Sequence, residues 1–467
     1  MINKEQLINI GSEKLAEIIL SLYNSNISIQ KQLDVILASL DEDPKKIVSM
    51  IKAEIASLKK SSRFIDYYES GDFATKIDQL RMHIARDLLP RFPNHAIDLL
   101  TAFLDLHPKT LNRVDDSNGV IGDVFIKACA DLANAYAAVT TSLDDIIELV
   151  FNRFMKNDYA VYDYIISNFK TILGDEGLKL LEQKLKHVYN SKNTMRISIG
   201  LKQIADCQDD VNAYIAACSF NATPSAHEHL EIAERFIKHW KGQEAIEWLD
   251  SIDLPRTHSW QNKRKALKIE ALELCGQYQE AQTERLHWFE ETLSPRVYKE
   301  IVKYAEVDFI GSFHKVAIQK ALEYYDPYAA ITFLVAIQEF EPLAILVHSK
   351  SSDLDGSNYN ILRPAADVLH KVDPLAATLL YRKMIQPILA NTKSKYYSYA
   401  AKDLVTCGIL SNEITDWKQY QNHETYFLEL STQHKRKTSF WAGYQTAIAK
   451  QKQKEAKILK VSRTEPI

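Results

Sequence analysis

Residues 113–125 are the segment whose side chains are best suited to chemistry. The segment contains Arg113, two of the thirteen glycines of the chain, and three carboxylates, Asp115, Asp116 and Asp123. Carboxylates bind metal ions or basic partners and act as general acids and bases, and glycines let a ligand approach the backbone. One hypothesis is therefore an enzyme site or a small-ligand or metal site at residues 113–123.

A second interpretation of this segment is a structured connector between two helices. It does not fit an EF-hand, because Val114 and Phe125 stand where the first Asp and the bidentate Glu of that loop are needed. Asp, Ser, Asn and Gly are also the residues that form turns and cap helices. We favour the connector, in which Asp116 or Ser117 caps the next helix and Arg113 pairs with a carboxylate.

Residues 61–68, Ser-Ser-Arg-Phe-Ile-Asp-Tyr-Tyr, form a second candidate. On a helix, Arg63 and Asp66 would pair on one face, with Phe64 and Tyr67 on the neighbouring face. Arginine and aromatic side chains together are typical of binding hot spots. They are also typical of a helix that packs on its neighbour, which is the interpretation we favour.

The third candidate is a basic C-terminal stretch that begins with Lys435, Arg436 and Lys437. Residues 434–463 contain nine Lys or Arg and one acid, Glu455, although the whole chain has a net charge of −4. A cationic end on an acidic body can bind a nucleic-acid backbone. The alternative is a terminal helix that caps the array with its apolar residues, which we favour because repeat arrays need a polar outer face at their ends.

Other chemical signals are missing from the sequence. It contains no GxxxxGK[ST], GxGxxG, HExxH or GxSxG motif, so we expect no cofactor and favour a non-catalytic protein. The five cysteines are scattered without a CxxC pair, which predicts neither a disulfide framework nor a zinc site and favours the cytoplasm. The longest apolar stretch, near residues 328–337, is too short to span a membrane.

The elements that must position these candidates are helices. Apolar residues recur at helical spacing, as in Ile146, Val150 and Phe154, and no alternating strand pattern of six or more residues is found. The pattern Pro-x-x-Ala-x-x-Leu/Phe begins at Pro93, Pro327 and Pro374, and the last two start 47 residues apart. Recurrence at such a period predicts an all-α fold, an α-solenoid of stacked antiparallel helix hairpins of the tetratricopeptide or HEAT kind.

Residues 226–295 resemble tetratricopeptide repeats. Gly242 and Gly276 lie 34 residues apart and are each followed by an alanine, Ala245 or Ala281. The resemblance implies a left-handed glycine between the two helices of each pair and an alanine at their closest approach. We divide the chain into an N-terminal helical block (1–110), a middle helical block (111–222), tetratricopeptide-like repeats (223–445) and a basic C-terminal helix or tail (446–467).

Several segments together resemble an uncharacterised bacterial family of long helical proteins, a domain of unknown function. The segments are 61–66, 113–125, 157–163, 293–298, 373–381, 394–401 and 434–441. The C-terminal part is also similar to helical regions that accompany SWIM zinc fingers, but the C-x-C…C-x-H pattern of that finger is missing. The resemblance therefore implies a fold and carries over no zinc or DNA function.

From these observations we expect an interaction scaffold that binds a protein or peptide in a groove formed by successive helices. The two alternatives are a nucleic-acid-associated protein that uses the basic C-terminal segment, and a catalytic or small-ligand site at residues 113–123. We expect no membrane partner. The oligomeric state stays open.

Overall fold

The structure is a computed structural model, and it describes residues 3–190, 192–220, 222–255 and 259–461. Within these residues the chain is all-helical, as the sequence predicts, and its one β-type pairing is an isolated bridge between Ile65 and Val114. No helix in the described part is both long enough and apolar enough to cross a membrane.

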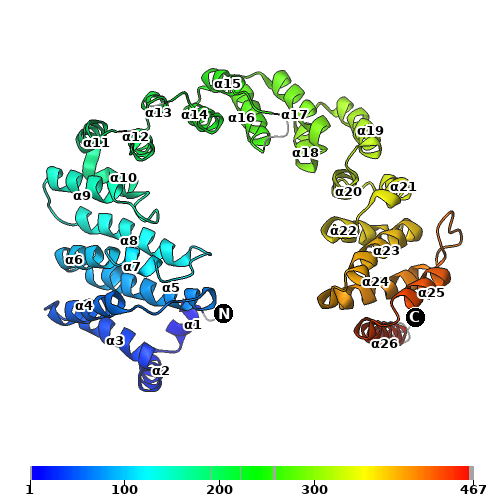
Figure 1. Ribbon diagram of the computed structural model, residues 1–467, viewed down its shortest axis with the longest axis horizontal. Helices are drawn as coiled ribbons and strands as arrows, with labels where there is room; N and C mark the ends of the chain where they lie inside the picture. The colour runs from blue at the N-terminus through cyan, green and yellow to red at the C-terminus, as the bar shows by residue number, and fades with distance from the viewer. Residues whose placement is uncertain (1–2, 191, 221, 256–258, 462–467) are drawn as a thin grey trace. The chain divides into compact units, whose positions relative to one another are not determined.

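The chain divides into two compact units, residues 1–235 and 236–467. The division falls inside α14 (Ala226–Lys238). The four segments of the sequence analysis were drawn from motifs and composition, and they stay a prediction. In each unit, helices pack mainly against helices that are close to them in the chain (Figure 1).

The first unit is built on a core of large aromatic and aliphatic side chains. Phe103, Phe125 and Phe154 are almost completely buried, and each comes from a different helix. The apolar stripe predicted around Val150 is buried as a stripe of α9, which Ser142 caps. The elements of this unit are α1 (Lys4–Asn9), α2 (Ser12–Ser25), α3 (Ile27–Ser39), α4 (Lys45–Lys60), α5 (Tyr67–Met82), the π-helix η1 (His83–Leu88), α6 (Pro93–Leu104), α7 (His107–Leu111), α8 (Val120–Ala137), α9 (Leu143–Met155), α10 (Ile165–Asn168), α11 (Lys170–His187), α12 (Thr194–Gln208), α13 (Val211–Cys218) and α14 (Ala226–Lys238).

The second unit is centred on α23, which buries eleven of its seventeen residues and packs against both α22 and α24. The elements of this unit are α15 (Gly242–Asp250), α16 (Gln261–Leu274), α17 (Tyr278–Thr292), α18 (Pro295–Tyr304), α19 (Val307–Glu323), α20 (Pro327–Ala336), α21 (Phe340–Lys350), η2 (Ser351–Asp353), α22 (Tyr359–Leu369), α23 (Pro374–Ala390), η3 (Ser394–Tyr396), α24 (Tyr397–Leu410), α25 (His423–Gln433) and α26 (Thr438–Val461).

The repeated proline pattern marks helix starts in both units. α6, α20 and α23 each begin at the proline of the pattern. The Asp326 carboxylate accepts a hydrogen bond from the N–H of Tyr328 (2.9 Å), and the Asp373 carboxylate accepts one from the N–H of Ala376 (2.8 Å). An aspartate N-cap followed by proline at the first helical position explains why these helices begin where they do.

The two glycines of the tetratricopeptide-like segment have different roles. Gly276 has the predicted left-handed conformation, with φ of 74°. For Gly242 this prediction is wrong, because the left-handed residue of its turn is Trp240, with φ of 60°. Gly242 instead opens α15, where an added Cβ would lie 2.6 Å from the carbonyl oxygen of Ala271. It is a close-packing position between α15 and α16.

Candidate functional site

The first two sequence candidates lie side by side in the first unit. The N–H of Ile65 donates to the carbonyl oxygen of Arg113 (3.0 Å), and the N–H of Asp115 donates to the carbonyl oxygen of Ile65 (2.8 Å). These two bonds form the isolated bridge, in which the segment before α5 pairs with the segment before α8. The structure thus joins residues 61–66 and 113–116, which are fifty positions apart in the chain.

The predicted helical pairing of Arg63 and Asp66 is wrong. α5 begins only at Tyr67, and the carboxylate of Asp66 caps it by accepting a hydrogen bond from the N–H of Glu69 (3.0 Å). Arg63 lies outside the helix, is exposed, and forms an ion pair with Glu69 instead. The bridge at Ile65 holds this segment in an extended conformation, so the three-residue spacing does not place the two side chains on one helix face.

The predicted pairing of Arg113 with a carboxylate is also wrong. Its side chain is buried, its guanidinium lies 5.2 Å from the centre of the Phe73 ring, and it donates to the carbonyl oxygen of Arg63 (2.9 Å). Burial lowers the pKa of Arg113. The side chain therefore connects its own segment to the backbone of the segment before α5.

The carboxylates of the 113–123 segment mainly serve the start of α8. Asp116 accepts hydrogen bonds from the N–H groups of Ile121 (2.9 Å) and Gly122 (2.8 Å), so its predicted capping role is confirmed. Asp115 accepts a hydrogen bond from the Ser117 hydroxyl, and Asp123 is exposed on the first turn of α8. In the described part of the chain, no group of three or more His, Cys, Asp and Glu is arranged to hold a metal ion. This geometry is that of a helix connector.

The basic candidate lies in the second unit, in the connection between α25 and α26. Lys435 and Arg436 are exposed. Lys437 donates to the hydroxyl of Thr392 (2.9 Å), and its ammonium group lies 6.0 Å from the centre of the Tyr397 ring. Phe440 on α26 is completely buried, and the role of this helix as a cap of a repeat array stays a prediction. The side chains of the predicted tail from Lys454 onward lie outside the described residues.

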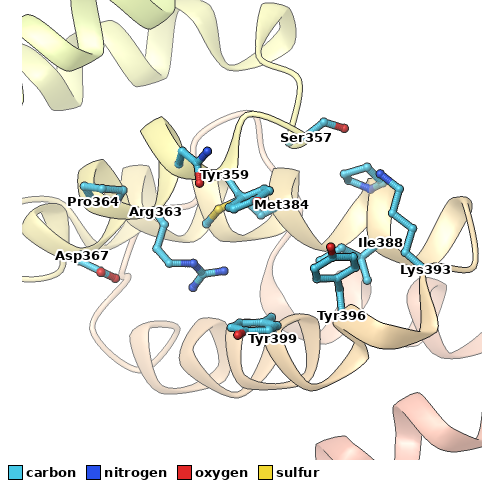
Figure 2. Close-up of a pocket in the computed structure, with 13 residues that line it drawn as sticks. Ser357, Tyr359, Arg363, Pro364, Asp367, Met384, Ile388, Lys393, Tyr396 and Tyr399 are labelled. Atoms are coloured by element: carbon cyan, nitrogen blue, oxygen red, sulfur yellow. The ribbon is translucent and has the colours of Figure 1, made fainter. Parts of the chain in front are cut away.

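A cleft in the second unit offers the most developed binding geometry. It has a volume of about 840 Å³ and lies between α22 and α23 on one side and η3 and α24 on the other (Figure 2). Three tyrosines that line it are about half exposed: Tyr359 (53%), Tyr396 (47%) and Tyr399 (53%). The complete lining is Gly356, Ser357, Tyr359, Asn360, Arg363, Pro364, Asp367, Met384, Pro387, Ile388, Lys393, Tyr396 and Tyr399.

Two helix-internal prolines and one glycine shape the backbone of the cleft. Pro364 in α22 and Pro387 in α23 have no N–H, so each leaves the carbonyl four residues earlier without its helical donor. The carbonyl freed by Pro387 is that of Lys383, and the loop before α22 approaches it very closely at Gly356. A Cβ added to Gly356 would lie 1.7 Å from that oxygen, so only glycine fits there.

Two charged groups of the cleft, Arg363 and Asp367, are held by partners on α24 and α23. Arg363 donates two parallel hydrogen bonds of 2.7 Å to the carboxylate of Asp403, and these bonds raise the pKa of Arg363. Burial raises the pKa of Asp403, whose side chain is 2% exposed. Figure 2 shows the Arg363 guanidinium directed into the cleft, toward Tyr399. A bidentate arginine–carboxylate pair fixes the guanidinium plane, so this cation is oriented before any ligand arrives.

Asp367 is likewise engaged. The Tyr381 hydroxyl donates to Asp367, and His370 Nε2 lies 2.8 Å from the Tyr381 oxygen. Because the hydroxyl proton points to Asp367, His370 must donate through Nε2. Burial raises the pKa of Tyr381. The arrangement places aromatic faces and charges along one cleft, and both carboxylates beside Arg363 are engaged by partners.

Sequence reasoning missed this cleft, and its signals were weak. Pro364 and Pro387 each interrupt an apolar helical pattern, and residues 396–399 read Tyr-Tyr-Ser-Tyr. Neither signal indicates a cleft without knowledge of which helices are neighbours. The packing of α23 between α22 and α24 brings together residues that are up to 43 positions apart.

The comparison with known families gives one match. The chain matches the family of unknown function DUF6880 over residues 1–443. No curated protein and no solved structure matches it significantly. The similarity of the C-terminal part to regions that accompany SWIM zinc fingers is not shown by these comparisons and stays a prediction. Since the match covers most of the sequence, the protein belongs to this family of unknown function.

Proposed function

We propose that this protein is a non-catalytic interaction scaffold that binds an extended peptide segment of a partner protein in the cleft between α22 and α24. The observation that carries the proposal is the set of three half-exposed tyrosines, Tyr359, Tyr396 and Tyr399, on two sides of one cleft. Tyrosines at this exposure present large aromatic faces and a hydroxyl to a ligand with little loss of side-chain entropy.

The floor of the cleft supports the same proposal. Pro387 and Ile388 of α23 are half-buried and supply apolar surface to the cleft, whereas Met384, which also lines it, is 1% exposed and presents almost none. An apolar floor with aromatic walls and a few fixed polar groups is typical of binding pockets, and 840 Å³ lies within their usual range. Burying a peptide side chain against these groups would provide a hydrophobic anchor, and Arg363 would provide directional hydrogen bonds.

We further propose that the helices form an α-solenoid of stacked antiparallel hairpins. Two observations support this arrangement. Helices within each unit pack mainly against chain neighbours, as α15 does on α16 and α16 on α17. The alanines at the expected points of closest approach, Ala245 and Ala281, are completely buried. Successive hairpins stacked in this way present extended surfaces, which suits a peptide-binding scaffold.

To test this, random linear peptides displayed on phage are selected for binding to the full-length chain. Peptides that also bind the double variant Tyr396→Ala/Tyr399→Ala are then removed by counter-selection. We expect enriched peptides whose affinity, measured by fluorescence anisotropy, falls at least about tenfold on the double variant. The matched control is Tyr278→Ala on α17, since Tyr278 is 68% exposed and lies outside the cleft. Peptides that bind the double variant and the unchanged protein equally well would contradict the proposal.

A further inference from the structure

The cleft opens at one end onto a group of cations that belong to two separate stretches of sequence. We call this group the basic rim and define it as Lys393, Lys395, Lys435, Arg436 and Lys437. Lys393 lines the cleft, and the rim residues other than Lys437 are exposed. The two stretches, residues 393–395 and 435–437, are about forty positions apart in the sequence, and the sequence analysis identified only the second as basic.

Two contacts join the stretches into one surface. Lys437 donates to the hydroxyl of Thr392, which places the end of the 435–437 stretch beside the connection from α23 to η3. α24 packs against α26, with the ring of Tyr397 edge-on to that of Phe440 at 5.9 Å. The rim is therefore held by buried side chains below it, and its cations lie beside the η3 end of the cleft.

Acidic groups are missing from the sequence around the rim. Residues 374–402 and 430–454 contain no Asp or Glu. The carboxylate that follows the first stretch, Asp403, is buried and bound to Arg363. The lysines and the arginine of the rim therefore raise the local positive potential, because neither stretch contains a carboxylate that would neutralise them.

The other end of the cleft has the opposite charge. Asp367 lines it on α22, and Figure 2 shows Asp367 and Lys393 at opposite ends of the cleft. The cleft is thus bipolar: the carboxylate of Asp367 lies at one end, the cations of the basic rim lie at the η3 end, and the tyrosines lie between them.

From this charge distribution we infer that the peptide held in the cleft carries a cluster of acidic residues at one end, seated on the basic rim, and apolar residues that contact the tyrosines. The inference rests on the proposed peptide-binding function. A nucleic acid carries negative charge along its whole length, and Asp367 would repel it at the end of the cleft opposite the rim. A peptide that is acidic at one end matches the whole cleft, because charges of opposite sign meet at the rim and none of like sign meet at α22.

The experiment uses peptides selected on the full-length chain that need Tyr396 and Tyr399 for binding. We expect Asp and Glu to be enriched at one end of these peptides. The double variant Lys393→Glu/Lys395→Glu should bind them about tenfold more weakly, since each exposed ion pair contributes modestly and reversal adds repulsion. Binding should also weaken several-fold between about 50 mM and about 200 mM salt. Lys315→Glu on α19, an exposed lysine outside the cleft, is the matched control.

The other outcomes separate the inference from the proposed function. Tyrosine-dependent peptides without acidic enrichment, unaffected by Lys393→Glu/Lys395→Glu, would overturn the inference and leave the proposed function intact. A selection that yields no tyrosine-dependent peptide would overturn both. An oligothymidylate of about 16 nucleotides that binds the chain more tightly than the selected peptides and displaces them would overturn the inference in favour of nucleic acid.

Discussion

Replacing Gly356 by alanine should destabilise the second unit and deform the cleft. The added Cβ would lie 1.7 Å from the carbonyl oxygen of Lys383 and 2.9 Å from the Cα of Met384. Both are backbone atoms of α23, so no side-chain rotation relieves the overlap. Because a Cβ does not approach another atom closer than 3.0 Å, the loop and α23 must separate by about 1.3 Å.

The size of the effect follows from where the separation occurs. Gly356 is buried, and α23 is the most buried helix of the second unit, so moving the loop opens a packed interface. Overpacking of this kind costs about 3 kcal/mol when the clashing atoms cannot move independently. The same movement displaces Ser357 and Tyr359, which line the cleft. Peptide binding should therefore weaken along with stability.

The assay is urea unfolding of the full-length chain, monitored by far-ultraviolet circular dichroism. The matched control is Gly311→Ala in α19, where an added Cβ meets no atom within 4 Å. Alanine in a helix interior is favoured over glycine by about 1 kcal/mol, so this variant should unfold at higher urea concentration. If Gly356→Ala unfolds at the same urea concentration as the unchanged protein, the reasoning from the Gly356 contact is refuted.

Three further predictions concern helix starts and close packing. Asp116→Ala should destabilise the first unit by about 1–2 kcal/mol in urea unfolding, because two N–H groups of α8 lose their acceptor. The control, Asp123→Ala at an exposed position, should change the stability by less than about 0.5 kcal/mol. Equal effects of the two substitutions would show that Asp116 does not cap α8. Burial opposes ionisation of Asp373, but hydrogen bonds from the α23 backbone and from His348 outweigh it and lower the pKa of this carboxyl. The ionised Asp373 therefore stabilises the fold above about pH 4, and this contribution is lost as the pH falls through the lowered pKa. The stability difference between the unchanged protein and Asp373→Asn should accordingly shrink in acid, and a difference that does not change with pH would contradict this. Gly242→Ala should lower the melting temperature and reduce the free energy of unfolding by about 2 kcal/mol, because the added Cβ would overlap a backbone carbonyl of α16. An unchanged melting temperature would show that α15 and α16 have room for the added methyl group.

The sequence by itself determined the helical nature of the chain and the starts of several helices. The apolar spacing around Val150 predicts a buried helical stripe, and the structure buries it in α9. Asp326-Pro327 and Asp373-Pro374 predict caps, and both aspartates accept hydrogen bonds from the helices that follow. These features were predictable because periodicity and capping depend on residues within a few positions of one another.

The sequence could not determine conformations set by contacts between distant segments. Arg63 and Asp66 have a spacing that suits a helix, but pairing of Ile65 with residues 113–115 keeps them out of one. Arg113 has three carboxylates nearby in sequence, yet it is buried against Phe73 and bound to a backbone carbonyl. In each case a tertiary contact overrides a local preference that is worth little by itself.

The cleft is the feature that only the tertiary structure decided. Its tyrosines, its arginine and its close glycine contact come from three α-helices, the 3-10 helix η3 and one loop, and none of them is unusual within its own segment. The basic residues at 435–437 were visible in the sequence, but their continuity with Lys393 depends on the contact of Lys437 with Thr392. Local patterns specify helices, whereas a binding surface depends on which helices pack together, and that is decided by the packing of buried side chains such as those of α23.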